Sequence, residues 1–336
     1  MAHTLLPAHP AGALKERLAG VRYVFTDLDA TMLAPGSCAL KDADGAPSLA
    51  LVEALIDLRR AGLEVIPLTG RNRAMIREDC RVLGFNSFIG ELGGLIMYDL
   101  AADDWEYFTG EMPYDPACGL TPHEVVERTG VVQRIVERWP GRIEYYNDMD
   151  RGYRYREVTF GLRGEVPGAE AQAILDEAGL GLLWVNNGQL GYVSKPTTLL
   201  LGPGERGHGY NVLARGLDKG AALERYCRRR GIDPAEAIAV GDSASDLLVA
   251  PYVGAFVLVE NGLADPEAAA LVERGENVYI TPGAAPRGWI HLARALLAAR
   301  EPDGAATPAG AGEQGRERGL ECGGVPAGAR NCGTDE

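Results

Sequence analysis

An apolar run that ends in two aspartates constrains this 336-residue chain more than any other feature. Residues 21–26 have the composition of a buried strand, and Asp27 and Asp29 follow it, separated by a single residue. Carboxylates this close together repel and tend to raise one another's pKa unless a cation lies between them. The pair could also open an ordinary turn, because Asp is common in loops after strands. The rest of the chain has to distinguish a chemical site from a turn.

The segments around this run alternate between strands and helices. Residues 51–60 have apolar positions at helical spacing, and residues 63–68 form a second apolar strand. Strand–helix–strand units of this kind predict an α/β fold with a doubly wound, Rossmann-like parallel sheet. The pattern returns later as a helix over 220–230, strands over 237–240 and 256–259, and a closing helix over 289–300.

The segment between about 90 and 200 has a different pattern of expected strands and helices, which predicts an inserted α+β domain. Its expected strands cover 105–108, 142–146, 155–160 and 182–185, and its expected helices cover 122–139 and 168–178. We therefore divide the chain into an N-terminal arm (1–19), a core (20–90 and 200–300), a cap (91–199) and a tail (301–336). The tail is rich in Gly, Ala and Pro and is expected to be disordered.

Composition narrows the classes of partner. The net charge of −14 disfavours nonspecific binding to nucleic acid or to anionic membranes. No apolar stretch approaches the roughly 20 residues that a membrane-spanning helix needs, and the N-terminus lacks the pattern of a secretory signal. The six cysteines form no Cys-x-x-Cys pair, and the five histidines are scattered, so any metal is expected to be held by oxygen. We expect a cytoplasmic protein with a small-molecule ligand.

Four polar signals occupy the same structural position, the carboxyl end of a strand or the start of a neighbouring helix. Each has an ordinary explanation on its own: a strand-to-helix turn, a solvated surface lysine, or a helix cap with a first-turn acid. Their joint placement is more telling, because ligands bind outside the carboxyl ends of the strands in open α/β sheets. The four signals are Asp27 with Asp29, Thr69 with Gly70, Lys219, and Asp242 with Asp246.

These residues give the chain a resemblance to the haloacid dehalogenase superfamily of phosphotransferases. The large insertion looks like the α+β cap of its Cof-type, sugar-phosphatase branch, and the resemblance covers about residues 20–298. The motifs that carry it are Asp27-Leu28-Asp29-Ala30-Thr31, Leu68-Thr69-Gly70-Arg71, Leu217-Asp218-Lys219-Gly220 and Gly241-Asp242-Ser243-Ala244-Ser245-Asp246.

The resemblance implies a role for each matching residue. Asp27 would be the nucleophile of an aspartyl-phosphate intermediate, and Asp29 would protonate the leaving alcohol and later activate water. That role requires Asp29 to be protonated part of the time, which crowding by other carboxylates would favour. Thr69, Gly70 and Lys219 would bind the phosphate. The implied cofactor is Mg²⁺, held by the Asp27 and Asp242 side chains and the Asp29 backbone carbonyl, with Asp246 behind these ligands.

Three positions depart from the family pattern. Ala30 replaces the glycine that usually follows the second aspartate, which narrows the conformations open to the loop. Ser245 stands where an asparagine is common, and Glu91-Leu92-Gly93-Gly94 matches the Glu-Asn-Gly segment at the start of the cap only loosely. None of the three replaces a residue that would contact phosphate or metal directly.

The cap is expected to set specificity, because the core motifs contact only phosphate and metal. Tyr155-Arg156-Glu157 and Gly241-Asp242-Ser243 suggest the mannosyl-phosphoglycerate and sucrose phosphatase branch. The resemblance thus implies a Mg²⁺-dependent phosphomonoester hydrolase acting on a sugar phosphate or a phosphoglycerate-linked sugar. A nucleoside monophosphate phosphatase, a phosphomutase and a non-hydrolytic phosphoaspartate regulatory module stay open. Candidate substrate contacts are Arg71 and the cap residues Arg154, Arg156, Asn186, Asn187 and Lys195. Each of the cap residues could equally lie on a solvated strand face.

Overall fold

The computed structural model describes residues 4–146, 155–190, 193, 195, 197–273 and 277–302. Its core is a parallel sheet of five strands in the order β12-β11-β10-β1-β2, which confirms the predicted α/β class. Strand β1, which lies between β10 and β2, carries the first motif at its carboxyl end. The strands are β1 (Tyr23–Thr26), β2 (Glu64–Pro67), β10 (Ala237–Gly241), β11 (Ala255–Leu258) and β12 (Val278–Ile280).

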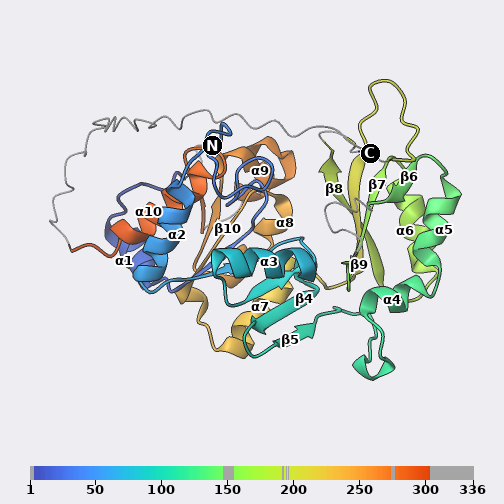
Figure 1. The fold of residues 1–336 in the computed structure, drawn as a ribbon, viewed down its shortest axis with the longest axis horizontal. Helices are drawn as coiled ribbons and strands as arrows, with labels where there is room; N and C mark the ends of the chain where they lie inside the picture. The colour runs from blue at the N-terminus through green and yellow to red at the C-terminus, as the bar shows by residue number, and fades with distance from the viewer. Residues whose placement is uncertain are drawn as a thin grey trace, which may run out of the picture. The chain divides into compact units, whose positions relative to one another are not determined.

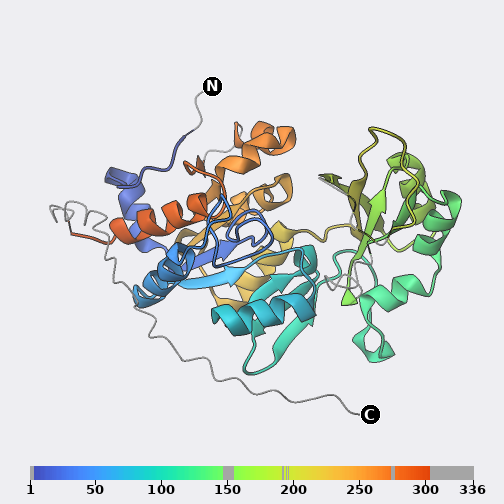
Figure 2. The ribbon, with the colours of Figure 1, turned by 45° about the horizontal axis from the view of Figure 1, so that its top comes forward.

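Helices cover both faces of this sheet because successive residues of β1 point to opposite sides. Val24 packs into one apolar cluster with α2 (Ala50–Arg60) and α10 (Arg287–Ala298), whereas Phe25 packs into a second cluster with α7 (Lys219–Arg230). Figures 1 and 2 show α2 and α10 lying together, with α1 (Gly12–Gly20) beside them.

One buried hydrogen bond links α10 to the strand that leads into the first motif. Trp289 is 1% exposed, and its indole Nε1 donates to Thr26 Oγ1 over 3.0 Å. A buried indole N–H needs such a partner, so the contact fixes α10 against the end of β1. The strand end is thereby held from the face opposite α7.

A smaller antiparallel sheet, β3-β4-β5, extends the core beyond β2. A parallel bridge joins Leu68 to Ile89, and Ile89, Ile96 and Tyr98 belong to the same buried cluster as Phe25. These strands therefore pack with the core, although the expected cap boundary lies at residue 91. The elements here are α3 (Arg73–Leu83), β3 (Phe88–Gly90), β4 (Leu95–Asp99) and β5 (Asp104–Tyr107).

A four-stranded antiparallel sheet in the order β6-β7-β9-β8 forms the inserted part of the fold. Three helices cover one of its faces through a separate apolar cluster (Figure 1). Its strands are β6 (Ile143–Tyr145), β7 (Phe160–Gly164), β8 (Leu182–Gln189) and β9 (His208–Ala214), and its helices are α4 (Pro122–Glu127), α5 (Val131–Arg138) and α6 (Gly168–Asp176).

Several expected elements of this insertion are wrong in detail. The single helix expected over 122–139 is two helices, separated at Gly130, whose φ is +70°. The strand expected over 155–160 begins only at Phe160, and the residues before it are irregular. Strand β9 pairs with β7 and β8, so chain that was assigned to the core from residue 200 onward contributes to the cap sheet. We propose cap limits near residues 109 and 217 in place of 91 and 199.

Two helices near the carboxyl end complete the core: α8 (Ala244–Leu247) and α9 (Pro266–Val272).

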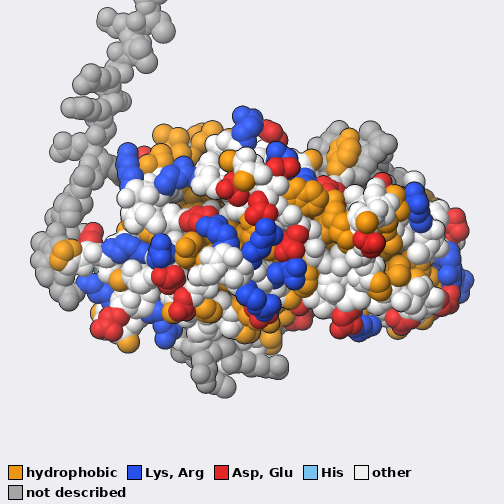
Figure 3. Space-filling model, turned by 90° about the horizontal axis from the view of Figure 1, so that it is seen from below, with side chains coloured by type: hydrophobic (Ala, Val, Ile, Leu, Met, Phe, Trp, Pro, Cys, Tyr) orange, Lys and Arg blue, Asp and Glu red, His pale blue; other side chains and the backbone are white. Residues whose placement is uncertain are grey.

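The surface charge of the protein is mixed. Lys and Arg side chains alternate with Asp and Glu on the face seen in Figure 3, in keeping with ion pairs such as Arg225–Glu106. Among the described residues, no helix has the length and apolar content needed to span a bilayer. The expected arm contains helix α1, and the expected tail lies outside the described residues from 303 onward.

Candidate active site

Asp27 and Lys219 form a buried ion pair at the carboxyl end of β1. The Asp27 amide donates to the Val240 carbonyl over 2.9 Å, which continues the β1–β10 ladder one residue past the strand. Lys219 is the first residue of α7, and its Nζ lies 2.9 Å from Asp27 Oδ1 and 2.5 Å from Asp246 Oδ1. Both side chains of the first pair are at least 90% buried. The ladder and the helix start thus bring two predicted residues into direct contact.

Burial shapes the protonation of this pair. It raises the pKa of Asp27 to about 7; the Lys219 charge opposes that rise, and Asp246 adds to it. Burial by itself would lower the pKa of Lys219, but the carboxylates of Asp246 and Asp27 outweigh it and hold that pKa above its usual value. Lys219 is therefore a permanent cation beside a carboxyl group that titrates near neutrality.

Asp242 follows β10 and faces the same space. Thr31 donates its hydroxyl to Asp242 Oδ1 over 3.0 Å. Burial raises the pKa of Asp242 to about 8, and the neighbouring carboxylates of Asp246 and Asp27 contribute to the rise. These effects outweigh the opposing charge of Lys219 and the hydrogen bond from Thr31, so the pKa of Asp242 lies well above the usual range for aspartate.

Both carboxylate oxygens of Asp246 are already engaged. Oδ1 accepts from Lys219, and Oδ2 accepts from the amides of Asp242 (3.1 Å) and Ser243 (3.0 Å) and from the Ser243 hydroxyl (2.7 Å). The bond from the Ser243 amide belongs to a capping box at the start of α8. Asp246 therefore orients Lys219 and the loop that carries Asp242, and its place behind the metal ligands stays a prediction.

The donor set suits a divalent cation that prefers oxygen. Asp27, Asp242 and Asp246 each offer a carboxylate oxygen, and the three oxygens lie within 4.8 Å of one another. Lys219 balances one negative charge, so the ionised cluster carries an excess that a divalent ion would neutralise. Carboxylate and carbonyl oxygens are the ligands that Mg²⁺ prefers. Because Asp246 is engaged elsewhere, Asp27, Asp242 and the Asp29 backbone carbonyl would hold the ion.

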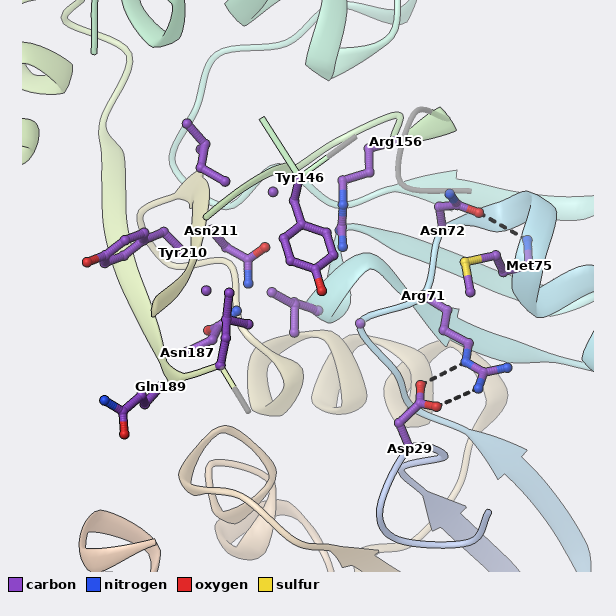
Figure 4. Close-up of a pocket in the computed structure, with 17 residues that line it drawn as sticks. Asp29, Arg71, Asn72, Met75, Tyr146, Arg156, Asn187, Gln189, Tyr210 and Asn211 are labelled. Atoms are coloured by element: carbon purple, nitrogen blue, oxygen red, sulfur yellow. Dashed lines mark hydrogen bonds and ion pairs between the residues drawn. The ribbon is translucent and has the colours of Figure 1, made fainter. Parts of the chain in front are cut away.

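Asp29 turns its carboxylate toward Arg71. Arg71 Nη2 lies 2.6 Å from Asp29 Oδ1 and Nε lies 2.9 Å from Oδ2, a paired arrangement that Figure 4 shows. Arg71 also contacts Asp79 at 2.6 Å. Burial would raise the pKa of Asp29, but the hydrogen bonds and charge of Arg71 outweigh it and leave the pKa below its usual value. The expectation that crowding by carboxylates raises this pKa is therefore wrong for the ligand-free site.

Thr69 and Gly70 lie where the motif predicted, at the end of β2. Thr69 is 1% exposed, its amide donates to the Ile89 carbonyl over 2.9 Å, and its hydroxyl accepts from the Arg71 amide over 3.3 Å. Gly70 lines a cavity together with Asp29 and Arg71. Both residues of the motif therefore face the same edge of the sheet as Asp27.

That cavity has a volume of about 260 Å³ and lies between the ends of the core strands and the open face of the cap sheet. Gly161 of β7 and Asn211 of β9 are register partners on that face, while their neighbours Phe160 and Val212 pack inward against the helices. Figure 4 shows Tyr146, Arg156 and Asn211 on the cap side, opposite the Asp29–Arg71 pair. The cap thus supplies a polar wall above the predicted phosphate site.

The candidate substrate residues separate in the structure. Arg156 and Asn187 line the cavity. Asn186 hydrogen-bonds to His208 over 2.8 Å, and Lys195 is exposed and outside the cavity lining. Arg71 lines the cavity but is paired with two aspartates, and Arg154 lies outside the described residues.

Sequence reasoning missed Asn261. Its Nδ2 donates to the Ala30 carbonyl over 2.8 Å and lies 3.4 Å from Asp242 Oδ2, while its Oδ1 accepts from the Ala285 amide. The available signal was its position just after β11, at the same edge of the sheet as the other site residues. Tyr146 and Asn211 carried no comparable signal, because only the folded cap brings them to the cavity.

Comparison with known proteins agrees with this geometry. Residues 205–274 match the family model described as haloacid dehalogenase-like hydrolase. The chain is 27% identical over 260 residues to a phosphoglycolate phosphatase from Methanopyrus kandleri, covering 76% of this chain and 93% of that protein. A phosphoglycolate phosphatase from Methanospirillum hungatei JF-1 is 23% identical, covering 73% and 86% respectively.

Solved structures share the fold. Thermoplasma acidophilum 0175 superposes with a TM-score of 0.54 at 17% identity, covering 82% of this chain and 99% of that one. The sucrose-phosphatase of Synechocystis sp. PCC6803, solved with sucrose and phosphate, has a TM-score of 0.52 at 16% identity, covering 82% and 94%. The resemblance predicted from the motifs is confirmed.

Proposed function

We propose that this chain, which belongs to the haloacid dehalogenase-like hydrolases, is a Mg²⁺-dependent phosphomonoester hydrolase that forms an aspartyl-phosphate on Asp27. The observation that carries the proposal is the buried Asp27–Lys219 pair at the strand ends, two residues along the chain from Asp29, which lines the cavity. A nucleophilic carboxylate, a permanent cation and a second carboxylate in one site are the groups that phosphoryl transfer requires.

In the first step, a carboxylate oxygen of Asp27 attacks the phosphorus, and the bond between phosphorus and the alcohol oxygen breaks. Asp29 gives its proton to the departing alcohol. Lys219 and Thr69 hold phosphate oxygens and stabilise the charge that develops on them. Mg²⁺ bound by Asp27, Asp242 and the Asp29 carbonyl would supply further positive charge when present.

In the second step, water attacks the phosphorus of the aspartyl-phosphate while Asp29 accepts its proton, which releases phosphate and restores Asp27. Arg71 holds the Asp29 carboxylate in one orientation for both roles. An arriving anionic phosphate places negative charge beside Asp29, which would raise its pKa toward the range in which it can carry a proton.

The substrate we propose is a small phosphorylated metabolite. The curated relatives are named for phosphoglycolate, which supports a short phosphorylated hydroxy acid. The polar cap wall also supports the sugar phosphates predicted from the sequence, including a phosphoglycerate-linked sugar. A cavity of about 260 Å³ lies just below the ~300–1,000 Å³ that pockets for drug-sized ligands occupy, which favours these compounds over a nucleoside monophosphate.

Colorimetric phosphate release across phosphoglycolate, sugar phosphates and nucleotides, with Mg²⁺ and with EDTA, tests the proposal. We expect turnover of at least one small phosphomonoester that EDTA abolishes, and none in Asp27→Asn. Asp57→Asn, which removes an exposed acid on α2, is the matched control and should be unaffected. Turnover that resists EDTA, or a phosphoaspartate that persists for minutes without release, would contradict the proposal.

A further inference from the structure

Asn211 of β9 brings to the cavity a side-chain amide that no described residue engages. The residue is 4% exposed, and it lines the cavity. Within the part of the chain that the structure describes, no hydrogen bond reaches this amide. Figure 4 shows it directed from β9 toward the interior of the cavity. Buried side-chain amides nearly always have a hydrogen-bond partner, so the partner of this one is expected in the cavity.

The neighbours of Asn211 on the open face of the cap sheet explain why its amide is left over. Its register partners are Gly161 of β7 and Val185 of β8, and its second neighbours along β9 are Gly209 and Leu213. None of these four side chains has a polar atom. Residues on one face of a sheet meet mainly their cross-strand partners and second neighbours, so no adjacent position supplies a hydrogen bond.

An asparagine at this position is unfavourable for the fold alone. Asparagine is depleted in strands, and an apolar side chain would suit these sheet neighbours without giving up hydrogen bonds to water. The other residues of β9 near it follow that rule, because Val212 and Leu213 are buried and apolar. Residues that break the local rule in this way are concentrated at functional sites. Asn211 is therefore better explained by recognition than by folding.

The chemistry of the amide indicates the group that it would recognise. An amide has N–H donors and a carbonyl acceptor in one plane. A hydroxyl group both donates and accepts, so two neighbouring hydroxyls can pair with both ends of the amide. A carboxylate only accepts, which would leave Asn211 Oδ1 without a donor. Asn187 and Gln189 of β8 add two further amides to the cap part of the lining.

The position of Asn211 suits a contact with the leaving alcohol. Asp29, which we propose to protonate that alcohol, lines the same cavity. Figure 4 shows Asn211 on the cap side and the Asp29–Arg71 pair on the core side. The alcohol part of a substrate whose ester oxygen lies at Asp29 would therefore extend into the space that Asn211 faces.

We propose that Asn211 is a specificity residue that binds hydroxyl groups of the leaving alcohol. The proposal rests on the proposed function and assigns its substrate class: phosphomonoesters of polyhydroxy compounds, such as polyols and sugars. Glycolate falls outside this class, because its single hydroxyl forms the phosphate ester and only a carboxylate remains for the cap side.

Four substrates test the assignment. Glycerol 3-phosphate and n-propyl phosphate share a three-carbon chain, with and without free hydroxyls, and phosphoglycolate carries a carboxylate instead. Glucose 6-phosphate extends the comparison to a larger polyhydroxy compound. We expect the wild-type kcat/KM for at least one polyhydroxy substrate to exceed those for n-propyl phosphate and phosphoglycolate by about 10-fold or more, because the latter two leave the buried amide incompletely paired.

Asn211→Leu keeps the approximate size of the side chain and removes both hydrogen-bonding groups. We expect the preference for the polyhydroxy substrate to fall to within about threefold, mainly through KM. Asn211→Ala should lose the preference as well, since it removes the same groups without filling the cavity. A loss in Asn211→Leu that Asn211→Ala does not share would indicate a steric block and overturn the assignment.

A stability measurement separates recognition from a structural role. Because the amide of Asn211 has no partner among the described residues, Asn211→Leu should leave the Tm of the ligand-free protein unchanged or raise it. Asn277→Leu is the matched control: it removes an amide that donates to the Ala250 and Val253 carbonyls. It should lower the Tm and leave the substrate preference unchanged. Inhibition by inorganic phosphate should be unchanged in Asn211→Leu, because core residues build the phosphate site.

Three results would overturn the assignment while leaving the phosphatase proposal intact. One is a wild-type kcat/KM no higher for either polyhydroxy substrate than for n-propyl phosphate or phosphoglycolate. Another is a preference that both Asn211 variants keep. The third is a loss of Tm in Asn211→Leu as large as that in Asn277→Leu, which would assign Asn211 to the fold. Absence of Mg²⁺-dependent release from all four substrates and from the wider panel would instead contradict the proposed function itself.

Discussion

Arg71 holds Asp29 through two nearly parallel hydrogen bonds of 2.6 and 2.9 Å. The Arg71 side chain is 8% exposed and its guanidinium also contacts Asp79, so it forms a rigid support behind the carboxylate that we assign as acid and base. Both residues line the cavity, beside the proposed phosphate site, where a leaving-group oxygen would have to be protonated. Its consequence is a pKa of Asp29 below the usual range.

Arg71→Gln should move the pH profile of phosphate release to higher pH. Burial of Asp29 remains while the charge that opposes it is lost, so the pKa of Asp29 rises. The general-base half of the reaction then requires a higher pH, and the loss of orientation should lower kcat by at least ~10-fold. Arg71→Lys, which retains the charge, should lower kcat with a smaller shift. Identical pH profiles for wild type and Arg71→Gln would argue against control of Asp29 by Arg71.

Ala30→Gly should stabilise the protein or leave its stability unchanged. Ala30 has a φ of +59°, a left-handed conformation that disfavours a residue with a Cβ by roughly 1–2 kcal/mol. Glycine removes this strain but gains flexibility in the unfolded chain, so the net change in the free energy of unfolding should be between about 0 and +1 kcal/mol. Denaturant unfolding of this variant, compared with Ala34→Gly in the same loop, provides the measurement. Equal losses in the free energy of unfolding of the two variants would contradict the backbone strain that we assign to Ala30.

The sheet and its catalytic edge were predictable because both follow from local pattern. Apolar runs such as 21–26 and 237–240 indicate buried strands, and parallel strands bring their carboxyl ends to one edge. The Ala30 departure was also visible, since the glycine it replaces suits the left-handed conformation found there. No knowledge of the cap was needed for either prediction.

The cap was harder to predict because its contacts join distant residues. Glu91 is bonded to residues 157–159, and these contacts replace the strand that the sequence pattern favours. The break at Gly130 depends on one left-handed residue between two helix-forming segments. The paired hydrogen bonds from Arg71 that lower the pKa of Asp29 are likewise tertiary contacts. Counting charges along the sequence predicted that this pKa would instead be raised.

Mg²⁺ affinity should increase with pH between about 6 and 8. The metal-free pKa values of Asp27 and Asp242 are about 7 and 8, and metal binding requires their ionised forms. Because these folded-state pKa values exceed the usual aspartate value of 3.8, the free energy of unfolding of the metal-free protein falls as pH rises through them. The rise in Tm on adding Mg²⁺ should therefore be larger at high pH. Mg²⁺ affinities, measured by calorimetry, that do not change between about pH 6 and 8 would contradict this prediction.

Asp242→Asn separates the contribution of Asp242 to metal binding from its effect on the stability of the metal-free protein. The amide oxygen can still accept the Thr31 hydrogen bond, while the buried charge is removed. The Tm of the metal-free protein should rise at pH 8, and the response to Mg²⁺ should be lost together with ~10²-fold or more of the activity. A metal-free protein that is less stable than wild type at pH 8 would indicate that Asp242 is already well compensated.

Asn261→Ala should weaken Mg²⁺ binding by about 10-fold without removing a ligand. Asn261 braces both the Ala30 carbonyl and the Asp242 carboxylate, and groups that orient metal ligands typically contribute 10- to 100-fold in affinity. Asn277→Ala is the control, because Asn277 also makes two side-chain hydrogen bonds to backbone carbonyls but at Ala250 and Val253. Equal Mg²⁺ affinities in the two variants would show that Asn261 does not support the metal ligands.

The most direct measurement is the mass of the Asp27 peptide during turnover. Rapid acid quenching of the enzyme with phosphoglycolate or another hydrolysed substrate, followed by peptide mass spectrometry, should show one added phosphoryl group on the peptide that contains Asp27. The modification should decay as phosphate is released and should be absent from Asp27→Asn. Turnover with an unmodified Asp27 peptide at every quench time, or a phosphoryl group on another residue, would contradict Asp27 as the nucleophile.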